Sequence, residues 1–210
     1  MAPGRPRRRI VPVARRGGVG PSRRWLGAAL VVLAIAGTSR AAPASLPRLG
    51  PAPNFALTTQ QNDRLWLTHL RGRVVVLTFF CTTCDVCPAL LPSLLELSRS
   101  LDEPTRRRIF FVAISVDPRR DTWAVLRRFA RDRGADPRAW ALLTTDRPAE
   151  IDVVARWYGA AIERAEGRVR HACRVTLIDG TGQIRAQVDA PTPGRLREAI
   201  EALLAEGSAS

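Results

Sequence analysis

The sequence predicts an α/β sandwich in which a central mixed β-sheet is flanked by helices. Two observations carry this prediction. Residues 73–81 and 109–116 are continuous runs of β-branched and aromatic residues, typical of strands buried on both faces. Segments with helical spacing of apolar residues separate the predicted strands, so strands and helices alternate along the chain.

The predicted elements follow one another without an internal repeat. In order, they are strand 73–81, helix 88–101, strand 109–116, helix 121–133, strand 140–143, helix 150–158, strands 169–178 and 183–188, and helix 193–205. Pro88 suits the start of the first helix, where its missing N–H costs nothing. The second helix is expected to turn Val125, Leu126 and Phe129 inward. Asp179-Gly180-Thr181-Gly182 is a hairpin signal between the last two strands.

Length and composition limit the class of protein. The chain has 210 residues, of which 46% are hydrophobic and 25% charged, which is the composition of one globular domain with a leader. Disordered, collagen-like and polytopic membrane proteins are thereby excluded. Four cysteines are too few for a disulfide scaffold, so their placement matters more than their number.

The net charge of +14 is concentrated at the N-terminus. All 33 basic residues are arginine, and nine of them lie in residues 1–44, which contain no Asp or Glu. A nucleic-acid-binding domain needs a basic stripe on its folded surface. The best candidates are Arg106-Arg107-Arg108 and Arg127-Arg128, which are better explained as solvated helix faces, and no nucleic-acid partner is expected.

Residues 1–44 are predicted to be a signal peptide or an N-terminal membrane anchor. A basic stretch precedes an apolar run at 25–37 and then small residues, the order of a secretory signal. The apolar run is shorter than the roughly 20 residues of a spanning helix. A Pro-rich tether is expected at 45–53, and the working domain at 54–207. The domain is expected outside the cytoplasm, where cysteine pairs can form disulfides.

Cys84 and Cys87 are the principal candidate site residues. They stand where a buried strand ends and a helix begins, and a helix N-terminus stabilises the thiolate that attacks disulfides and binds soft metals. They are close enough to bridge each other or to hold one ion, although an inert disulfide or two buried thiols remain alternatives. Cys81 continues the alternating side-chain pattern of the preceding strand and is therefore expected in the core. The alternative is that Cys81 is a third ligand of a metal site formed with Cys84 and Cys87.

His171 is the candidate third ligand. It begins the stretch His171-Ala172-Cys173, and sites in α/β folds assemble at strand edges near a helix N-terminus. Two thiolates and one imidazole form a soft site suited to copper. Cys173 shares a strand face with His171 and is expected in the core, with a spare thiol near the site as the alternative. The other histidine, His69, is expected on the surface.

These residues resemble the SCO/SenC family of copper chaperones. The similarity runs from about Pro53 to the C-terminus and rests on three motifs in the right order. They are Thr83-Cys84 with Asp85-Val86-Cys87-Pro88, the segment Ser115-Val116-Asp117-Pro118-Arg119-Arg120-Asp121-Thr122, and His171 eight residues before Asp179. The family has three residues between its cysteines, beginning with Pro, whereas this chain has two.

The resemblance implies a thioredoxin-like fold and a copper site. By this resemblance, Cys84, Cys87 and His171 bind Cu(I) or Cu(II) and pass it to the binuclear copper centre of cytochrome c oxidase. A disulfide is then expected between Cys84 and Cys87. The implied partner is the copper-acceptor subunit of the oxidase or another exported thiol protein, met at the periplasmic or extracytoplasmic face of the cell membrane. The protein would be anchored there through an uncleaved leader or released.

The alternative function is thiol–disulfide exchange. In that case Cys84 and Cys87 would be a catalytic redox pair that attacks a partner's disulfide through a mixed disulfide. The two-residue spacing favours exchange, whereas the presence of His171 favours metal binding, because exchange has no use for it. A thiol peroxidase is disfavoured, since the Thr expected three residues before the attacking thiol is replaced by Cys81 or Cys84. The sequence therefore favours a metallochaperone over an enzyme.

Overall fold

The computed structural model describes residues 45–84, 89–165 and 168–207. The chain divides into two compact units, Met1–Ala41 and Ala42–Ser210, and the described residues belong to the second unit. The predicted leader at 1–44 lies outside them. Across the described ranges, no helix combines the length and the apolar character needed to cross a membrane.

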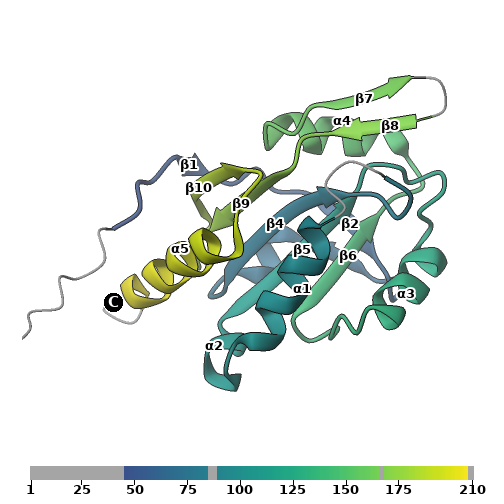
Figure 1. The fold of residues 1–210 in the computed structure, drawn as a ribbon. Coiled ribbons are helices and arrows are strands. Elements are labelled where there is room, and N and C mark those ends of the chain that lie inside the picture. Colours follow the sequence, from purple (N-terminus) through teal and green to yellow (C-terminus); the bar gives the residue numbers. More distant parts are fainter. Residues whose placement is uncertain (1–44, 85–88, 166–167, 208–210) are drawn as a thin grey trace, which may run out of the picture. The chain divides into compact units, whose positions relative to one another are not determined.

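An eight-stranded mixed sheet forms the centre of the described unit (Figure 1). Its order is β1-β10-β9-β4-β5-β6-β2-β3. The strands are β1 (Gly50–Pro51), β2 (Ala56–Thr59), β3 (Arg64–Trp66), β4 (Val74–Phe80), β5 (Ile109–Ser115), β6 (Trp140–Thr144), β9 (Arg174–Ile178) and β10 (Gln183–Asp189). Strands β4, β5 and β6 run parallel, whereas β9 pairs antiparallel with β4 and β2 antiparallel with β6. The predicted mixed sheet is confirmed.

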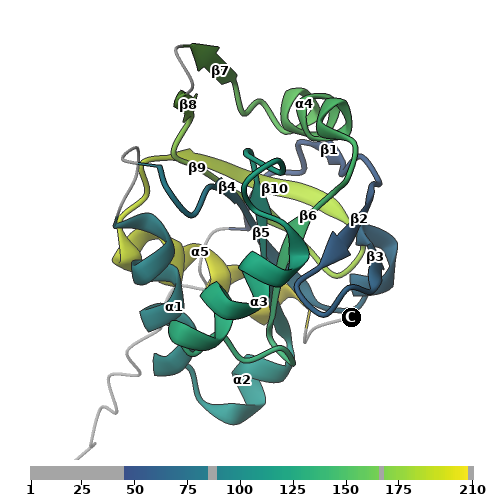
Figure 2. The same ribbon diagram turned by 90° about the vertical axis from the view of Figure 1, so that its right-hand side faces the viewer.

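Helices cover both faces of this sheet, and a separate hairpin stands beside it (Figures 1 and 2). The helices are η1 (Leu67–Leu70), α1 (Leu90–Ser100), α2 (Glu103–Arg107), α3 (Trp123–Asp132), α4 (Pro148–Trp157) and α5 (Pro193–Glu206). The hairpin consists of β7 (Ile162–Ala165) and β8 (Arg168–His171). Elements α2, η1, β1, β3 and β7 were not predicted from the sequence.

The apolar strand β4 separates two halves of the core. Because side chains alternate along a strand, Val74, Val76 and Phe80 belong to the cluster formed with α1, α3 and α5. The intervening residues Val75, Leu77 and Phe79 belong to the cluster formed with α4 and η1. Every residue of β4 and β5 is buried, which is the reason that both strands are recognisable as continuous apolar runs.

The buried face of helix α3, which packs against the sheet, is narrower than predicted. Leu126 and Ala130, one turn apart, are its buried residues, and Phe129 is half-buried. Val125 is 41% exposed, so its predicted inward orientation is wrong. The helix begins after Thr122, whose side chain accepts a hydrogen bond from the Val125 backbone N–H. Val125 thus lies in the first turn, beside the stripe that contacts the sheet.

The stretch 45–53, expected to be a tether, contacts the domain along much of its length. Gly50 and Pro51 form β1 against β10. The backbone N–H of Leu46 donates to Glu206 Oε1 at 3.1 Å, and Arg185 Nε donates to the carbonyl oxygen of Pro47 at 3.1 Å. These bonds hold the segment against the C-terminal helix and the sheet edge.

Candidate metal centre

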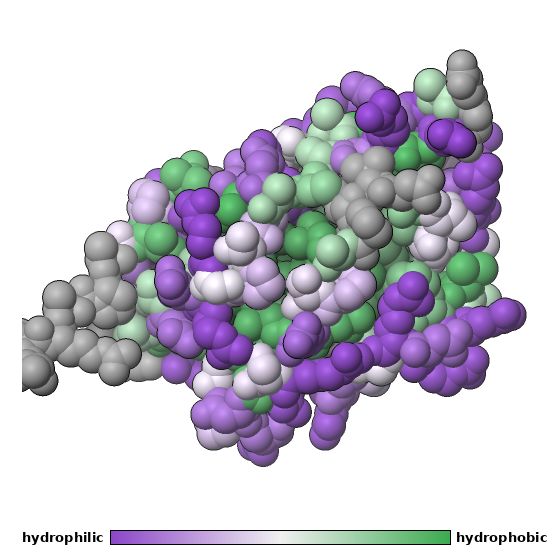
Figure 3. All heavy atoms as spheres, viewed as in Figure 1, coloured by the Kyte–Doolittle hydropathy of each residue, from purple (hydrophilic) through white to green (hydrophobic). Residues whose placement is uncertain are grey.

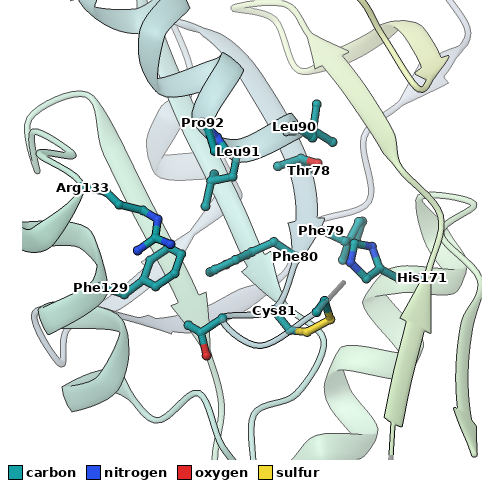
Figure 4. Close-up of a pocket in the computed structure, with 12 residues that line it drawn as sticks. Thr78, Phe79, Phe80, Cys81, Leu90, Leu91, Pro92, Phe129, Arg133 and His171 are labelled. Atoms are coloured by element: carbon teal, nitrogen blue, oxygen red, sulfur yellow. A yellow bond between two sulfur atoms is a disulfide. The ribbon is translucent and has the colours of Figure 1, made fainter. Parts of the chain in front are cut away.

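A cavity of about 150 Å³ opens where β4 ends (Figure 4). Its walls come from β4 and the turn after it, from the start of α1, from α3 and from the end of β8. The lining residues are Thr78, Phe79, Phe80, Cys81, Thr82, Cys84, Leu90, Leu91, Pro92, Phe129, Arg133 and His171. Figure 3 shows apolar surface in the recess between α1 and α3, bordered by hydrophilic residues. Cys84 and His171, predicted from the sequence to share a site, are therefore brought to one cavity.

A disulfide joins Cys81 and Cys84 in this cavity (Figure 4). Their Cα atoms are 5.3 Å apart, and both residues are half-buried. The predicted Cys84–Cys87 bond is therefore not the one found, because the sulfur of Cys84 is already bonded. Cys87 lies outside the described residues. Cys173, expected in the core, is half-buried and is not a free thiol.

The position of Cys81 corrects a second prediction. Strand β4 ends at Phe80, whose carbonyl oxygen accepts a hydrogen bond from the Val116 backbone N–H at 2.8 Å. Cys81 therefore begins a turn and does not continue the strand's alternation into the core. This turn brings its side chain within bonding reach of Cys84.

His171 is the most informative residue of the cavity. It is the last residue of β8, it is 7% exposed, and it is drawn pointing into the cavity in Figure 4. Its Nδ1 lies 3.1 Å from the carbonyl oxygen of Ala172, which only accepts, so Nδ1 carries the proton. Its Nε2 is buried and has no hydrogen-bond partner in the described part of the chain. Burial lowers the pKa of His171, while the Ala172 hydrogen bond opposes that shift.

The strand that carries His171 is interrupted after it. One strand was predicted over 169–178, but β8 ends at His171 and β9 begins at Arg174. Strand β8 pairs with β7, whereas β9 pairs with β4 and β10. At the break, the carbonyl oxygen of Cys173 accepts from the Ala190 backbone N–H at 2.6 Å. The interruption lets His171 leave the main sheet and line the cavity.

A buried carboxylate holds the cysteine turn in place. Asp121 is fully buried, and its Oδ2 accepts hydrogen bonds from the Thr82 backbone N–H at 3.0 Å and from Ser115 Oγ at 2.6 Å. The hydroxyl of Thr82 donates to the other oxygen, Oδ1. Thr82 stands between the two bonded cysteines, so Asp121 anchors their turn to the end of β5.

The segment 115–122 was recognisable as a motif in the sequence, but no role for its individual residues was predicted. Asp121 and Thr82 are the positioning residues that it missed. The signal was present, because the motif places Asp121 in the loop six residues after the last residue of a buried strand, and loops that follow strands commonly carry the side chains of a site. The structure also adds Phe129 and Arg133 to the cavity wall, with the Arg133 guanidinium 3.8 Å from the centre of the Phe129 ring.

The donors fit a soft metal ion better than a hard one. A neutral imidazole with a free Nε2 lone pair suits copper, and a thiolate of Cys84 in the same cavity would supply a soft ligand once it is reduced. Within the described residues, no group of three or more His, Cys, Asp or Glu side chains is arranged to hold a metal. With Cys84 bonded to Cys81, the described ligand set is that of an oxidised site.

Comparison with known proteins assigns the family. The model of the SCO1/SenC family matches residues 47–205. The chain belongs to the SCO1/SenC family. The solved structure of BsSco, 21% identical to this chain with a TM-score of 0.66, is described as that of a member of the Sco family of cytochrome c oxidase assembly proteins. The resemblance inferred from the motifs and the thioredoxin-like fold that it implied are confirmed.

Three similar proteins illustrate the relationship of this SCO1/SenC chain to the family. A protein of Stutzerimonas stutzeri named putative copper-binding protein is 27% identical over 152 residues, covering 70% of this chain and 72% of that protein. The structure of Bradyrhizobium japonicum ScoI with copper bound is 28% identical with a TM-score of 0.59, covering 72% of this chain and 97% of that one. A SCO1/SenC lipoprotein from Bacillus anthracis shares the fold, with a TM-score of 0.69 and 24% identity over 77% of this chain and 99% of that one.

Proposed function

We propose that this protein is an exported copper-binding metallochaperone that delivers copper to the binuclear copper centre of cytochrome c oxidase. Cys84, Cys87 and His171 are the ligands in this proposal. The observation that carries it is the state of His171. A buried Nε2 without a hydrogen-bond partner among the described residues costs free energy, unless something binds it.

Two features of the structure favour metal binding by the His171 imidazole. The Ala172 carbonyl oxygen holds the proton on Nδ1, which leaves the Nε2 lone pair free. Burial lowers the pKa of His171 and so keeps the ring neutral, the form that coordinates a metal. Neither arrangement is needed for thiol exchange, so both favour the metallochaperone.

The cysteines supply the soft, negatively charged ligands. Two thiolates neutralise and match a soft copper ion, and the imidazole completes a site of low coordination number. Such a site leaves room for an incoming ligand of the acceptor, which permits transfer. Because Cys84 is bonded to Cys81 in the structure, the copper-binding form is the reduced one.

Export is part of the proposal. The basic and apolar leader at 1–44 motivates it, and a disulfide such as Cys81–Cys84 suits an oxidising compartment. The copper acceptor, a subunit of the oxidase or another exported thiol protein, would be met at the extracytoplasmic face of the membrane.

Copper titration of the reduced full chain tests the proposal. A competition titration with a Cu(I) chelator should find one ion per chain, and His171→Ala should weaken binding by at least about tenfold, equivalent to about 1.4 kcal/mol. His69→Ala is the matched control, because His69 is exposed and lies outside the cavity. Unchanged Cu(I) affinity in His171→Ala would remove His171 from the site and the metallochaperone from consideration.

Thiol–disulfide exchange is the second candidate function. The Cys81–Cys84 disulfide lining an open cavity is the observation in its favour. An insulin-reduction assay on the same variants separates the two functions. Full reductase activity in His171→Ala, together with an absence of copper binding in the unmodified chain, would favour the oxidoreductase.

A further inference from the structure

We propose that the edge of the main sheet opposite the cysteine cavity lies against the anionic surface of a membrane. Four arginines that have no carboxylate partner in the described part of the chain mark this edge, and they are called the edge arginines below. They are Arg48, Arg71, Arg73 and Arg108. The inference goes beyond the proposed function, because it concerns a different surface and does not involve copper.

The order of strands in the sheet brings three of the edge arginines together. Arg73 and Arg108 directly precede β4 and β5, which run parallel, so both residues lie where these two strands begin. Gly72, which follows Arg71, donates its backbone N–H to the carbonyl oxygen of Gly180 at 2.9 Å. Because Gly180 belongs to the turn between β9 and β10, that turn lies at the same edge as the starts of β4 and β5.

Arg48 reaches this edge from the N-terminal segment. The backbone N–H of its neighbour Leu49 donates to the carbonyl oxygen of Ile184 at 2.8 Å. Ile184 in β10 pairs with Ile178 in β9, which pairs with Val75 near the start of β4. The side chain of Leu49 is 56% exposed, so an apolar group accompanies the charges at this edge.

The cysteine cavity lies at the other end of β4. This strand begins directly after Arg73 and ends at Phe80, and the turn that follows carries the Cys81–Cys84 disulfide. Figure 1 shows the segment before β1 and the end of α5 on the left, away from the hairpin β7–β8 that carries His171. A membrane at the arginine edge would therefore leave the cavity open to a partner.

Local contacts hold three of the guanidinium groups at the edge without neutralising them. The Arg73 guanidinium lies 4.3 Å from the centre of the Phe110 ring. Arg108 Nη2 donates to a backbone carbonyl oxygen of α5 at 2.6 Å. The Arg71 guanidinium lies over Gly182, so closely that a side chain at this glycine would overlap it. The positive charges are therefore available to an external anion.

Carboxylates of the same region already bind other arginines or a helix end. Asp179 and Glu206 both bind Arg185, at 3.0 Å and 2.6 Å. Glu103 binds two arginines of α2, and Asp102 accepts a backbone hydrogen bond at the start of that helix. These four carboxylates face three arginines, so the edge arginines leave an excess of positive charge.

An anionic lipid surface is the partner that these observations favour. Each arginine near such a surface strengthens binding about fivefold. Eight residues, 38–45, separate the predicted apolar run at 25–37 from Leu46, whose N–H donates to Glu206 at 3.1 Å. Even fully extended, they span only about 30 Å. A leader held in the membrane would therefore keep the arginine edge close to the lipid head groups.

Arginine footprinting of the full chain tests the proposal. The chain is mixed with vesicles of phosphatidylcholine, with or without phosphatidylglycerol, and treated briefly with phenylglyoxal, which modifies accessible guanidinium groups. Mass spectrometry should find that the anionic vesicles slow the modification of Arg48, Arg71 and Arg108 about fivefold, the factor by which each contact favours the membrane. Arg127 and Arg128, at exposed positions of α3, are controls and should react equally with both kinds of vesicle.

Salt distinguishes a contact made by charge from one made by apolar groups. At about 1 M NaCl the Debye length falls to about 3 Å, so the protection of the edge arginines should disappear. Protection that persists in high salt, or that is equal in the two kinds of vesicle, would overturn the proposal. Protection of Arg127 and Arg128 in place of the edge arginines would also overturn it, because another face would then meet the membrane.

Two matched variants test whether the edge arginines cause the contact. Arg48→Gln/Arg71→Gln and Arg127→Gln/Arg128→Gln each remove two exposed charges that form no ion pair among the described residues. Anionic vesicles should slow backbone hydrogen exchange in the turn 179–182 of the unmodified chain and of the α3 variant. The edge variant should show no slowing, because losing two contacts weakens the attraction about 25-fold. Equal slowing in all three chains would contradict the proposal, and no outcome depends on copper binding.

Discussion

The carboxylate of Asp121 lies 3.0 Å from the backbone nitrogen of Thr82 and accepts its hydrogen bond inside the protein. The two residues are 39 positions apart in sequence, so the contact ties the cysteine turn to the loop that follows β5. Ser115 donates to the same carboxylate oxygen. Asp121 thereby satisfies several buried donors with one side chain, and it determines where Cys81 and Cys84 stand relative to the sheet.

Replacing Asp121 with Ala should destabilise the protein. The substitution leaves the Thr82 and Ser115 donors without their acceptor, and the expected loss in the free energy of unfolding is about 3 kcal/mol. Urea unfolding followed by circular dichroism measures it. Asp132→Ala is the control, since Asp132 is exposed at the end of α3, and a change within about 0.5 kcal/mol is expected there. Equal losses in the two variants would contradict the anchoring role.

Arg185→Met should weaken the attachment of the segment before β2. Arg185 is 5% exposed and bonds Asp179 at 3.0 Å, Glu206 at 2.6 Å and the Pro47 carbonyl oxygen at 3.1 Å. Its removal leaves two acidic groups without their common partner, for an expected loss of about 3 kcal/mol in the free energy of unfolding. Faster proteolysis near residue 47 should accompany that loss. Arg107→Met, at an exposed pair, should change neither measurement.

Tyr158→Phe should reduce the alkaline sensitivity of the protein. The hydroxyl of Tyr158 donates to the Pro53 carbonyl oxygen at 2.6 Å, and burial raises the pKa of this phenol. The unfolded chain then loses the phenolic proton near pH 10 while the folded chain keeps it, so stability falls as the pH rises above about 10. The variant should lose about 1 kcal/mol at neutral pH but show a smaller further loss at about pH 11. Tyr158 is the only tyrosine, so an unchanged alkaline slope would disprove this explanation.

Acid should destabilise the copper-free protein through His171. Burial lowers the pKa of His171 in the folded protein, so below about pH 6.5 the unfolded chain binds a proton that the folded chain does not. The free energy of unfolding should therefore fall as the pH drops below that value, until the lowered pKa is passed. Urea midpoints between about pH 7 and pH 5 should vary less in His171→Asn than in the unmodified chain. His69→Asn, at the surface, should keep the full dependence.

Strong local patterns account for the parts of the fold that were predicted correctly. Strands β4 and β5 are buried at every residue, so their apolar runs are unambiguous in any tertiary context. The helices α1, α4 and α5 carry apolar residues at helical spacing and were found close to their predicted bounds. The inward orientation predicted for Val125 was wrong. Successive side chains of a helix point about 100° apart, and the buried face of α3 includes Leu126 but not Val125.

The amino-acid sequence alone was sufficient to name Cys84 and His171 as site residues and to indicate the family, because their types and order along the chain carry that information. It could not choose the disulfide, since Cys81 and Cys87 are each three residues from Cys84. That choice depends on long-range contacts. Asp121, 39 positions further along the chain, holds Thr82 between the two bonded cysteines. The Ala190 N–H donates to the carbonyl oxygen of Cys173, where the chain passes from β8 to β9. Each contact joins segments far apart in the chain, and only folding brings them together.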